Sequence, residues 1–411
     1  MKCRHCGAHL DLSLVDLGSA PPSNAYLSAH ALKMPEKWFP LSVLVCRVCW
    51  LVQTEDFAQA SELFDSDYAY FSGFSSSWLA HCERYVADMI ARFDLDAESH
   101  VVEVAANDGS LLQYFMQRDI PCTGVEPTAS TAQSARSKGI PVVEGFFGVS
   151  LAKELLTEGK QADLMTANNV LAHVPDINDF VAGFATLLKP HGVATFEFPS
   201  LLRLVEENQF DTIYHEHFSY LSLTAASKIF AGNGLEAFEV QQIPTHGGSL
   251  RVFCQRSDTG PCTVDASIQD MLLQEVNTGI IGTAFYADFQ PRAENVKNEF
   301  LEFLLQARRE GKRVAAYGAA AKGNTLLNFA GVRADLLPFV VDRNPAKQNK
   351  YLPGSRIPIV SEEQLLKYRP DYVVILPWNL KSEIMQQLAY IKDWSGFFVT
   401  AVPRLSVVPA C

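Results

Sequence analysis

The sequence predicts an α/β protein in which a parallel sheet is wrapped by helices, with a cysteine-rich lobe before it and a second α/β unit after it. Two C-x-x-C pairs open the chain, short apolar runs alternate with amphipathic helices from His100 onward, and a new strand-turn-helix pattern follows Arg313. Because 411 residues exceed the size at which a single core usually stops growing, two or three domains are expected. We place the domains at residues 1-73, 74-258 and 259-411.

Composition and charge narrow the kind of partner that the chain can have. A formal net charge of -12 argues against nucleic-acid binding, which needs clustered cations. The first residues, MKCRHCGAHL, lack an apolar signal core, and no run of about 18 apolar residues predicts a membrane span. With 48% hydrophobic residues available for packed cores, we expect a soluble, cytoplasmic protein that binds neither nucleic acid nor membrane.

Four of the nine cysteines form two C-x-x-C pairs, Cys3 with Cys6 and Cys46 with Cys49, separated by 39 residues. Four thiolates paired in this way can surround a tetrahedral zinc ion, and the closed set predicts a structural rather than a catalytic metal. Such a metal would stabilise a lobe that is too small to form a sufficient core of its own. Redox-active dithiols are the alternative.

An aromatic, hydroxyl-rich stretch, DYAYFSGFSSSW, follows the cysteine-rich lobe. Its tyrosines Tyr68 and Tyr70 are candidates for a substrate cleft, with packing as an equal alternative. A helix is predicted from about Trp78, because apolar residues recur at helical spacing as far as Phe93.

The alternation after His100 predicts the central sheet. The apolar runs HVVEVAA, PCTGVEP, ADLMTANN and GVATFEFP are separated by helical segments such as SLLQYFMQRD, which is typical of parallel strands with crossover helices. Ligands of such sheets bind at the carboxyl ends of the strands. The later runs LEAFEVQQIP and GGSLRVFCQ lie close together in the chain and predict an antiparallel hairpin at one edge.

The first of these strands ends in a segment that resembles the acidic, glycine-rich loop that binds S-adenosylmethionine. Small residues after an acidic one let the backbone approach a ligand closely, and the candidate cofactor-binding residues are Glu103, Ala105, Asn107, Asp108 and Gly109. Ala105 and Asn107 stand where glycines are common, and a structural tight turn is the alternative. Glu126, 17 residues after Gly109, could accept hydrogen bonds from both ribose hydroxyls.

The fourth strand of the central sheet ends at Asn168 and Asn169, which are further candidates for cofactor contact. In methyltransferases, groups at this position lie near the methyl donor and the acceptor. His173 follows and could touch either ligand, or it could be a buried histidine that caps a helix.

A second nucleotide-binding pattern follows a long helical stretch. Gly318, Ala320 and Gly323 occupy the three positions of G-x-G-x-x-G, and Asp342 lies about where a ribose carboxylate would be. The methyl group of Ala320 obstructs the approach of the backbone to a pyrophosphate, which disfavours NAD binding. Lys322 could instead anchor a substrate diphosphate, with a solvated residue at a helix start as the alternative.

The run Tyr214, His215, Glu216 and His217 places four side chains that can move protons or bind anions between apolar stretches. A histidine titrates at roughly pH 6.5 when unperturbed, and a neighbouring carboxylate can orient it and raise its basicity. On an extended strand these side chains would alternate between two faces, so a bend is expected if three of them converge. The pattern predicts a general base, with a structural hydrogen-bonded cluster or an adventitious metal site as the alternative.

Nearly the whole chain resembles the S-adenosylmethionine-dependent C-methyltransferases that act at C-3' of nucleotide-linked 4-keto-deoxysugars. The shared segments, in order, are the two C-x-x-C pairs, DYAYFS, EVAANDG, NNVLAHVP, DTIYHEHFSY, THGGSLR, YGAAAKGNT and VDRNPAKQNKYLPG. The resemblance implies a zinc-binding lobe, a class I methyltransferase domain with a Rossmann-like sheet, and a C-terminal Rossmann-like domain that closes the sugar-nucleotide site without NAD. It implies S-adenosylmethionine and Zn²⁺ as cofactors. Because such a chain makes its own cleft, a monomer is expected.

The resemblance also implies roles for residues of the matching motifs. His217 matches the family's proposed base, with Glu216 and Tyr214 beside it, and His173 matches another active-site histidine. One of the two linker tyrosines matches a tyrosine near the sugar. Some members have an acidic residue in place of His215, and the candidates for substrate binding are His215, His246 and Lys322.

Methyl transfer to carbon explains why such residues are needed. Carbon attacks a sulfonium methyl only after activation as an enolate, so a proton must leave C-3' beside the C-4' ketone. We expect His217 to take this proton, Tyr214 or a neighbouring histidine to stabilise the enolate, and Glu216 to orient the base. Either a TDP or a GDP carrier is compatible with the residues. The other functional classes are an NAD-dependent nucleotide-sugar oxidoreductase or epimerase and a zinc-containing scaffold without catalysis.

Overall fold

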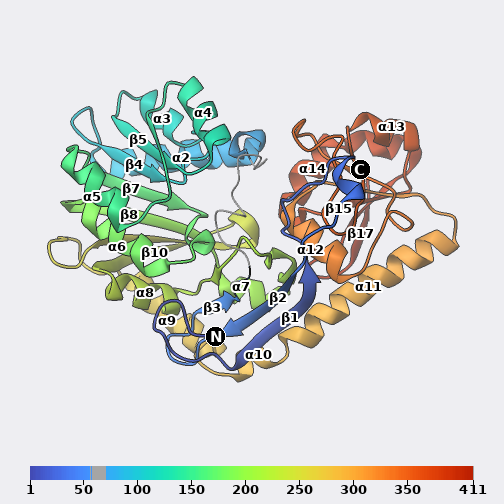
Figure 1. Cartoon of the computed structure of the whole chain (residues 1–411), viewed down its shortest axis with the longest axis horizontal. Coiled ribbons are helices and arrows are strands. Elements are labelled where there is room, and N and C mark those ends of the chain that lie inside the picture. The colour runs from blue at the N-terminus through green and yellow to red at the C-terminus, as the bar shows by residue number, and fades with distance from the viewer. Residues whose placement is uncertain (56, 58–70, 411) are drawn as a thin grey trace.

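Three β-sheets organise the protein, whose structure is a computed structural model that describes residues 1–55, 57 and 71–410. Figure 1 shows the central sheet and its helices on the left, the C-terminal sheet on the right and the N-terminal strands below, between the two. The predicted α/β class is confirmed. The residue boundaries of the predicted domains stay a prediction.

The N-terminal sheet has four strands in the order β1-β2-β3-β9, and all neighbours are antiparallel. Its last strand comes from the middle of the chain, because Val52 pairs with Tyr220 and Gln53 pairs with Ser219. The segment that contains the histidine cluster is therefore attached to the cysteine-rich lobe. The strands are β1 (Leu12–Ala20), β2 (Phe39–Val45), β3 (Val52–Thr54) and β9 (Ser219–Tyr220).

The central sheet has seven strands in the order β10-β11-β8-β7-β4-β5-β6. β4 to β8 are parallel to their neighbours within that set, whereas β11 is antiparallel to both β8 and β10. The predicted parallel sheet with an antiparallel hairpin at one edge is thus confirmed. The strands are β4 (Val101–Val104), β5 (Cys122–Glu126), β6 (Val142–Glu144), β7 (Ala162–Asn168), β8 (Leu188–Pro199), β10 (Leu235–Ile243) and β11 (Ser249–Arg256).

Helices cover the central sheet, and the first shows how the sequence forms them. In α2 the Ser75 hydroxyl accepts a hydrogen bond from the Trp78 amide and caps the N-terminus, while Tyr85, Val86 and Met89 form the buried face. The helix predicted from about Trp78 is confirmed. The helices are α2 (Ser76–Phe93), α3 (Leu112–Met116), α4 (Ala129–Ser137), α5 (Val149–Thr157), α6 (Ile177–Leu187), α7 (Leu201–Glu206) and α8 (Leu223–Gly232).

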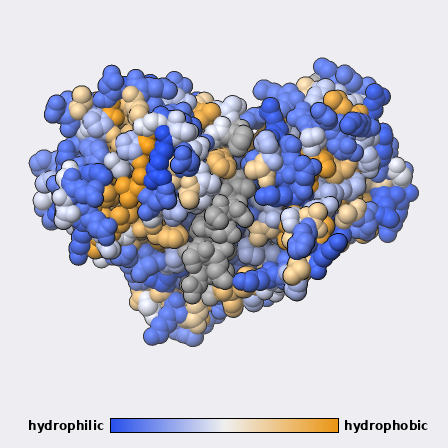
Figure 2. Space-filling view, turned by 45° about the horizontal axis from the view of Figure 1, so that its top comes forward, coloured by the Kyte–Doolittle hydropathy of each residue, from blue (hydrophilic) through white to orange (hydrophobic). Residues whose placement is uncertain are grey.

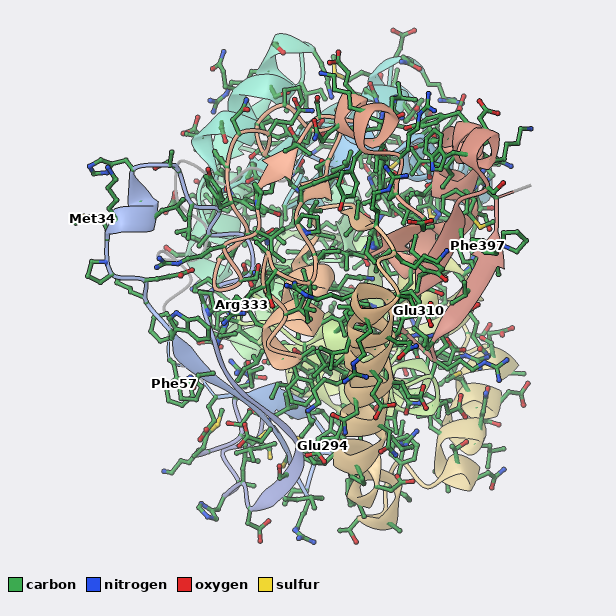
Figure 3. All side chains as sticks on the ribbon, turned by 90° about the vertical axis from the view of Figure 1, so that its right-hand side faces the viewer. Met34, Phe57, Glu294, Glu310, Arg333 and Phe397 are labelled. Atoms are coloured by element: carbon green, nitrogen blue, oxygen red, sulfur yellow. The ribbon has the colours of Figure 1, made fainter. Side chains whose placement is uncertain are left out.

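Three helices lead from the central sheet to the C-terminal one: α9 (Ala266–Thr278), α10 (Ala284–Ala287) and α11 (Phe289–Arg309). Helix α11 spans the lower right of Figure 1 and has a buried apolar stripe that includes Phe289, Phe300 and Leu304. Its other side is solvated, as Glu294 on the helix and Glu310 at its end show in Figure 3. This helix therefore joins the two halves of the molecule with one packed face.

The C-terminal sheet has six strands in the order β14-β13-β12-β15-β16-β17, of which only β17 is antiparallel to its neighbour. The strand-turn-helix pattern predicted after residue 313 is present as β12 followed by α12. The elements are β12 (Val314–Tyr317), α12 (Ala321–Phe329), β13 (Val340–Val341), β14 (Ile359–Val360), α13 (Glu363–Tyr368), β15 (Tyr372–Ile375), α14 (Lys381–Gln387), β16 (Phe397–Thr400) and β17 (Ser406–Pro409).

The segment between β1 and β2 crosses to the C-terminal sheet. Leu27 and Tyr351 exchange backbone hydrogen bonds of 2.9 and 2.8 Å, and the Tyr26 hydroxyl donates to the Ala319 carbonyl at 2.7 Å. Figure 3 shows Met34 at the outer end of this segment. Because one hydrophobic core runs through residues of all three sheets, the parts are packed against each other as well as linked by the chain.

The surface of the molecule is mostly hydrophilic over both halves in the view of Figure 2. Within the described residues, every helix is too short or too polar to cross a membrane.

Candidate active site

A cavity of about 370 Å³ opens at the carboxyl ends of the parallel strands of the central sheet. This is the place where the parallel strands predict a ligand. Of the eight predicted cofactor-binding residues, five line it: Ala105, Asn107, Glu126, Asn168 and Asn169. The lining residues come from successive strand ends of the sheet. Residues after β6 form one end of the wall, and residues at the ends of β5, β4 and β7 follow. His246, between β10 and β11, forms the other end.

The loop after β4 holds two non-glycine residues in the left-handed region, Ala105 at φ 58° and Asn107 at φ 49°. An alanine in this region costs about 1–2 kcal/mol, and an asparagine tolerates it better. Contacts hold the strained backbone in place, because the Asn107 amide donates to Glu126 at 2.9 Å and its side-chain oxygen accepts from the Ser72 amide at 3.0 Å. The loop thus adopts a glycine-like shape at the positions where the sequence departs from the common pattern.

Three residues predicted to bind the cofactor support this loop instead of lining the cavity. Glu103 is buried in β4, where burial, with a smaller effect of nearby carboxylates, raises its pKa well above the usual range. Asp108 accepts a hydrogen bond from the Gly73 amide at 3.2 Å, and a Cβ on Gly109 would come within 2.2 Å of Ile140. These contacts give Glu103, Asp108 and Gly109 a role in shaping the loop, and their predicted contacts with the cofactor stay predictions.

Glu126 ends β5 and lines the cavity. One oxygen of its carboxylate accepts the Asn107 amide and the other accepts the Thr128 amide, both at 2.9 Å. Burial raises its pKa despite these bonds. Because a carboxylate oxygen has two lone pairs, each oxygen retains one that could accept a hydroxyl of a ribose.

The histidine cluster bends, as predicted. The His217 amide donates to the Tyr214 carbonyl at 2.9 Å, which closes a turn with His215 and Glu216 at its centre. The first and last side chains of the turn meet, with the Tyr214 and His217 rings 3.9 Å apart between centroids. The His173 ring approaches from η3 (Leu171–His173) and lies 4.6 Å from the His217 ring.

Hydrogen bonds fix the tautomers of the two histidines. Nδ1 of His217 lies 2.9 Å from the Thr212 carbonyl, and Nδ1 of His173 lies 2.7 Å from the Glu216 carbonyl. Since a carbonyl only accepts, each Nδ1 carries a hydrogen and each Nε2 has a lone pair when the ring is neutral. Burial lowers the pKa of His173 to about 4 and lowers that of His217 well below its usual value, with the charge of His173 also contributing to the latter. Both rings are therefore neutral near pH 7 and able to accept a proton.

The other two residues of the cluster point elsewhere. The Glu216 carboxylate accepts from the backbone and side-chain amides of Asn24, at 3.2 and 3.3 Å, instead of orienting His217. His215 turns toward the N-terminal sheet, with Nε2 3.1 Å from the Pro40 carbonyl. The predicted orienting role of the Glu216 side chain is corrected, because the carbonyl of Thr212 fills it. The predicted substrate contact of His215 is replaced by packing on β2.

A buried charged network supports the end of the cavity at His246, a predicted substrate-binding residue. The Glu197 carboxylate contacts His81 at 2.9 Å and the Arg251 guanidinium at 2.6 Å. His81 stacks on Trp78, which lines the cavity and meets the His246 ring edge-on. Although burial opposes it, the bond from His81 and the charge of Arg251 hold the pKa of Glu197 below its usual value. A buried ion pair therefore lies behind this wall.

Lys322, the third predicted substrate-binding residue, reaches the same region from α12. Its ammonium donates to Asn379 at 2.9 Å and lies 4.7 Å from the centre of the Trp378 ring. The Trp378 indole donates to the buried Asp211 carboxylate at 2.8 Å. These contacts link the C-terminal half to η4 (Phe210–Thr212), which directly precedes the histidine cluster.

The four cysteines of the two C-x-x-C pairs converge, with their sulfur atoms all within 4.8 Å of one another. The Cys3–Cys49 and Cys6–Cys46 sulfur pairs are each 3.5 Å apart. A tetrahedral zinc ion with sulfur bonds of about 2.3 Å needs sulfur atoms roughly 3.8 Å apart, so the set fits the metal. Gln53, in the strand next to β9, donates to the Cys3 sulfur at 3.3 Å and ties the metal site to the sheet.

Comparisons with known proteins agree with this arrangement. Family models described as "Putative zinc binding domain", "Methyltransferase domain" and "C-methyltransferase C-terminal domain" match residues 3–64, 78–240 and 244–403. The chain is 34% identical to the C-methyltransferase NovU of Streptomyces niveus over 409 residues, which cover 100% of this chain and 97% of the relative. The chain belongs to the C-methyltransferase family.

Two further likenesses each cover less than half of this chain. The chain is 29% identical to the ubiquinone biosynthesis O-methyltransferase of Bordetella avium (strain 197N) over 175 residues, or 37% of this chain and 71% of the relative. A solved structure of magnesium protoporphyrin IX methyltransferase (ChlM) from Synechocystis PCC 6803, with bound SAH, is similar over 44% of this chain and 83% of that chain, with a TM-score of 0.36 and 17% identity.

As a C-methyltransferase, the protein uses S-adenosylmethionine as its methyl donor, and its four-cysteine site holds zinc. The cavity at the strand ends suits a nucleoside, because its wall has both aromatic side chains, such as Phe146, and polar ones, such as Glu126 and Asn168. Sequence reasoning missed Phe146, Phe147 and Asp179 in this wall, although two adjacent phenylalanines after a predicted strand are a usable signal. It also missed Asp211 and Trp378, whose contact joins residues far apart in the chain.

Two predictions concern other parts of the C-methyltransferase. Tyr68 and Tyr70 lie outside the described residues. The chain itself fills the turn that resembles a dinucleotide-binding loop. The Ala319 amide donates to Asp342 at 2.8 Å. The Ala319 carbonyl accepts from Lys347 at 2.8 Å and from Tyr26 at 2.7 Å. The Ala319 amide, which could donate to a pyrophosphate, is thus already bound, and the side chains of Tyr26 and Lys347 lie against the turn.

Proposed function

We propose that the protein methylates C-3' of a nucleotide-linked 4-keto-deoxysugar through an enolate. The observation that carries the proposal is the tautomer of His217: its Nδ1–H is held by the Thr212 carbonyl, so its Nε2 can accept a proton beside the methyl-donor cavity. Buried, neutral histidines beside a cavity suit proton abstraction next to a ketone.

The proposed reaction begins when Nε2 of His217 takes the proton from C-3'. The electron pair of that C–H bond forms a double bond to C-4', and the carbonyl pair moves to oxygen. Tyr214, whose ring lies on His217, is placed to donate its hydroxyl to this oxygen. The enolate carbon then attacks the methyl carbon, the sulfur–methyl bond breaks, and S-adenosylhomocysteine and a proton are released.

The roles of the other residues follow from their positions. S-adenosylmethionine supplies the methyl group, and Glu126, Asn168 and Asn169 would hold its nucleoside at the strand ends. His173 and His246 line the donor cavity, and the sugar would be bound beside them, toward Lys322. A weak base accounts for only part of the rate acceleration, and the positioning of both substrates supplies much of the rest.

The rival function is NAD-dependent oxidation or epimerisation of a nucleotide sugar by the C-terminal half. The side chains of Tyr26 and Lys347 on the Ala319 carbonyl, together with the methyl group of Ala320, argue against it. The zinc-containing scaffold is disfavoured because two neutral histidines with fixed tautomers serve no evident packing purpose beside a cavity.

Incubation of the purified protein with TDP- and GDP-4-keto-6-deoxysugars in D₂O tests the proposal. With S-adenosylmethionine present, the product should carry one added methyl group at C-3'. With S-adenosylhomocysteine in its place, deuterium should enter C-3' without methylation. Turnover that requires NAD, or methylation at oxygen, would refute the proposed function.

A further inference from the structure

Helix α12 carries Lys322 to the histidine cluster. Lys322 and Thr325 are three residues apart and so share one face of the helix. The Thr325 hydroxyl donates to the carbonyl of Ile213 at 2.8 Å, and Ile213 directly precedes Tyr214. The face of α12 that carries Lys322 is therefore docked on the segment that holds the base.

Contacts from both halves of the molecule hold the ammonium group in place. Lys322 donates to Asn379 and lies over the face of Trp378, while the indole N–H of Trp378 is bound to Asp211. The ring of Trp378 also packs tightly on η5 (Thr245–Gly247), since a Cβ on Gly247 would come within 2.4 Å of it. A flexible side chain is thus fixed by a cation–π contact and one hydrogen bond.

One donor hydrogen of Lys322 is used in the bond to Asn379. An ammonium group has three donors, and the described residues provide no second acceptor for it within hydrogen-bond distance. Two donors are therefore available to a ligand between α12 and the histidine cluster. A lysine that only filled a structural position would be expected to satisfy more of its donors.

The charges around Lys322 favour an anion that forms during the reaction. Burial lowers the pKa of His217 and His246, and the positive charge of Lys322 lowers both further, which places the ammonium within electrostatic reach of these rings. Burial raises the pKa of Asp211 to about 7, against the opposing effect of Lys322. Burial lowers the pKa of Lys322 itself, and the nearby Asp211 opposes this effect, so an anion that forms beside the ammonium would stabilise its charge.

We propose that Lys322 stabilises the enolate oxygen that develops at C-4' when His217 removes the C-3' proton. The inference rests on the proposed function and changes the role predicted for this residue from anchoring a diphosphate to stabilising the transition state. The ammonium keeps its protons throughout: it donates a hydrogen bond to the oxygen as negative charge moves there from C-3'. Trp378 and Asp211 are positioning residues that hold the ammonium at this point.

The two roles for Lys322 predict different kinetics. A diphosphate anchor contacts substrate and transition state equally, so its loss raises KM and leaves kcat unchanged. A group that stabilises the oxygen only as negative charge develops acts on kcat instead. Its loss lowers kcat by about 10²- to 10³-fold for one donor of this kind. Exchange of the C-3' proton with solvent isolates this step, because it needs the enolate but no methyl transfer.

The experiment compares wild type, Lys322→Met, Lys322→Arg and the control Lys297→Met. Lys297 also lies over an aromatic ring, Phe329, at 5.3 Å, but its side chain comes from α11. Deuterium entry at C-3' of a saturating TDP- or GDP-4-keto-6-deoxysugar is followed with S-adenosylhomocysteine bound, and binding of the matching nucleoside diphosphate is measured by calorimetry.

Lys322→Met should slow exchange by about 10²- to 10³-fold at saturation with nucleotide affinity unchanged, and Lys297→Met should behave as wild type. Lys322→Arg, which retains the charge and is the safer variant for folding, should keep part of the exchange. Normal exchange at saturation with weakened nucleotide binding, in either Lys322 variant, would overturn the inference and restore the diphosphate role. Failure of the wild type to exchange or methylate any of these sugars would instead refute the proposed function itself.

Discussion

The Nδ1–H of His217 donates to the Thr212 carbonyl across 2.9 Å. Thr212 belongs to η4, which is held on its other side by the bond between Asp211 and Trp378. The tautomer of the base is therefore set by backbone, and that backbone is positioned by the C-terminal half of the chain. A carboxylate partner, which is common for catalytic histidines, is replaced here by a neutral carbonyl that leaves the ring uncharged.

Substitution of His217 tests this assignment directly. His217→Asn should lower kcat by about 10²- to 10⁴-fold, the usual contribution of a general base, because no other group then receives the C-3' proton. Affinity for S-adenosylhomocysteine, measured by calorimetry, should stay unchanged since His217 does not line the donor cavity. His191→Asn, at an exposed position on the central sheet, is the matched control. A near-normal rate in His217→Asn would remove it as the base.

The pH dependence of the reaction should reflect the buried environment of the base. A base acts when deprotonated, and burial first, then the charge of His173, lowers the pKa of His217 well below 6.5. As the pH falls from about 8 to about 6, kcat/KM should therefore stay level, whereas an unperturbed histidine would already lose activity. An acid limb centred near the ordinary histidine pKa would contradict this. A limb near pH 7 that disappears in Asp211→Asn would belong to Asp211, whose pKa burial raises to about 7.

Local patterns predicted most of the fold because they depend on neighbouring residues. The C-x-x-C pairs, the alternation of strands and helices and the edge hairpin all follow from spacing along the chain. The pairing of β9 with β3 does not, since it joins Tyr220 to Val52 and is decided by packing between distant segments. A strand of only two residues, Ser219 and Tyr220, has no local pattern that would predict its place in the N-terminal sheet.

Only those parts of the candidate site that depend on neighbouring residues could be predicted from the sequence. The sequence placed Tyr214 and His217 near each other, and the expected bend brought their rings together. The sequence predicted that Glu216 orients His217, because the two residues are adjacent. In the turn, however, the Glu216 carboxylate points away from His217 and binds Asn24. The contact of Trp378 with Asp211 depends on how two halves of the molecule dock, which no local pattern contains.

The glycine of the donor loop should be sensitive to a single methyl group. Gly109 has φ 74°, and a Cβ there would come within 2.2 Å of Ile140 and 3.2 Å of Ala135. Gly109→Ala should therefore destabilise the protein by roughly 2–5 kcal/mol, from left-handed strain of about 1–2 kcal/mol plus overlap in a packed core of about 1–3 kcal/mol. Gly139→Ala is the control: Gly139 has φ 86°, but a Cβ there would have its closest contact at 3.5 Å, so this variant should lose stability through backbone strain only. Equal urea midpoints for the two variants would show that the overlap is relieved.

Zinc removal should inactivate the enzyme although the metal lies outside the donor cavity. Gln53 contacts the Cys3 sulfur and pairs with Ser219, two residues after the base. Loss of the metal would release β3, and with it the segment that positions His217. Cys49→Ser should therefore lower both the bound zinc, from one ion per chain, and the turnover, while Cys262→Ser, at a half-buried cysteine outside the cluster, should change neither. Zinc-free protein with full activity would show that the sheet holds the segment without the metal.

Glu216→Gln should retain most of the turnover despite its place beside the base. Its carboxylate is buried and accepts from Asn24, and an amide of the same shape keeps an acceptor oxygen at that place. Glu216→Ala should instead lower the free energy of unfolding by about 1–3 kcal/mol, because it leaves the amide groups of Asn24 unpaired. Steady-state kinetics and urea unfolding of both variants separate the two effects. If Glu216→Gln slowed C-3' exchange as strongly as His217→Asn does, the carboxylate would take part in proton transfer, and the carbonyl of Thr212 would not suffice to orient the base.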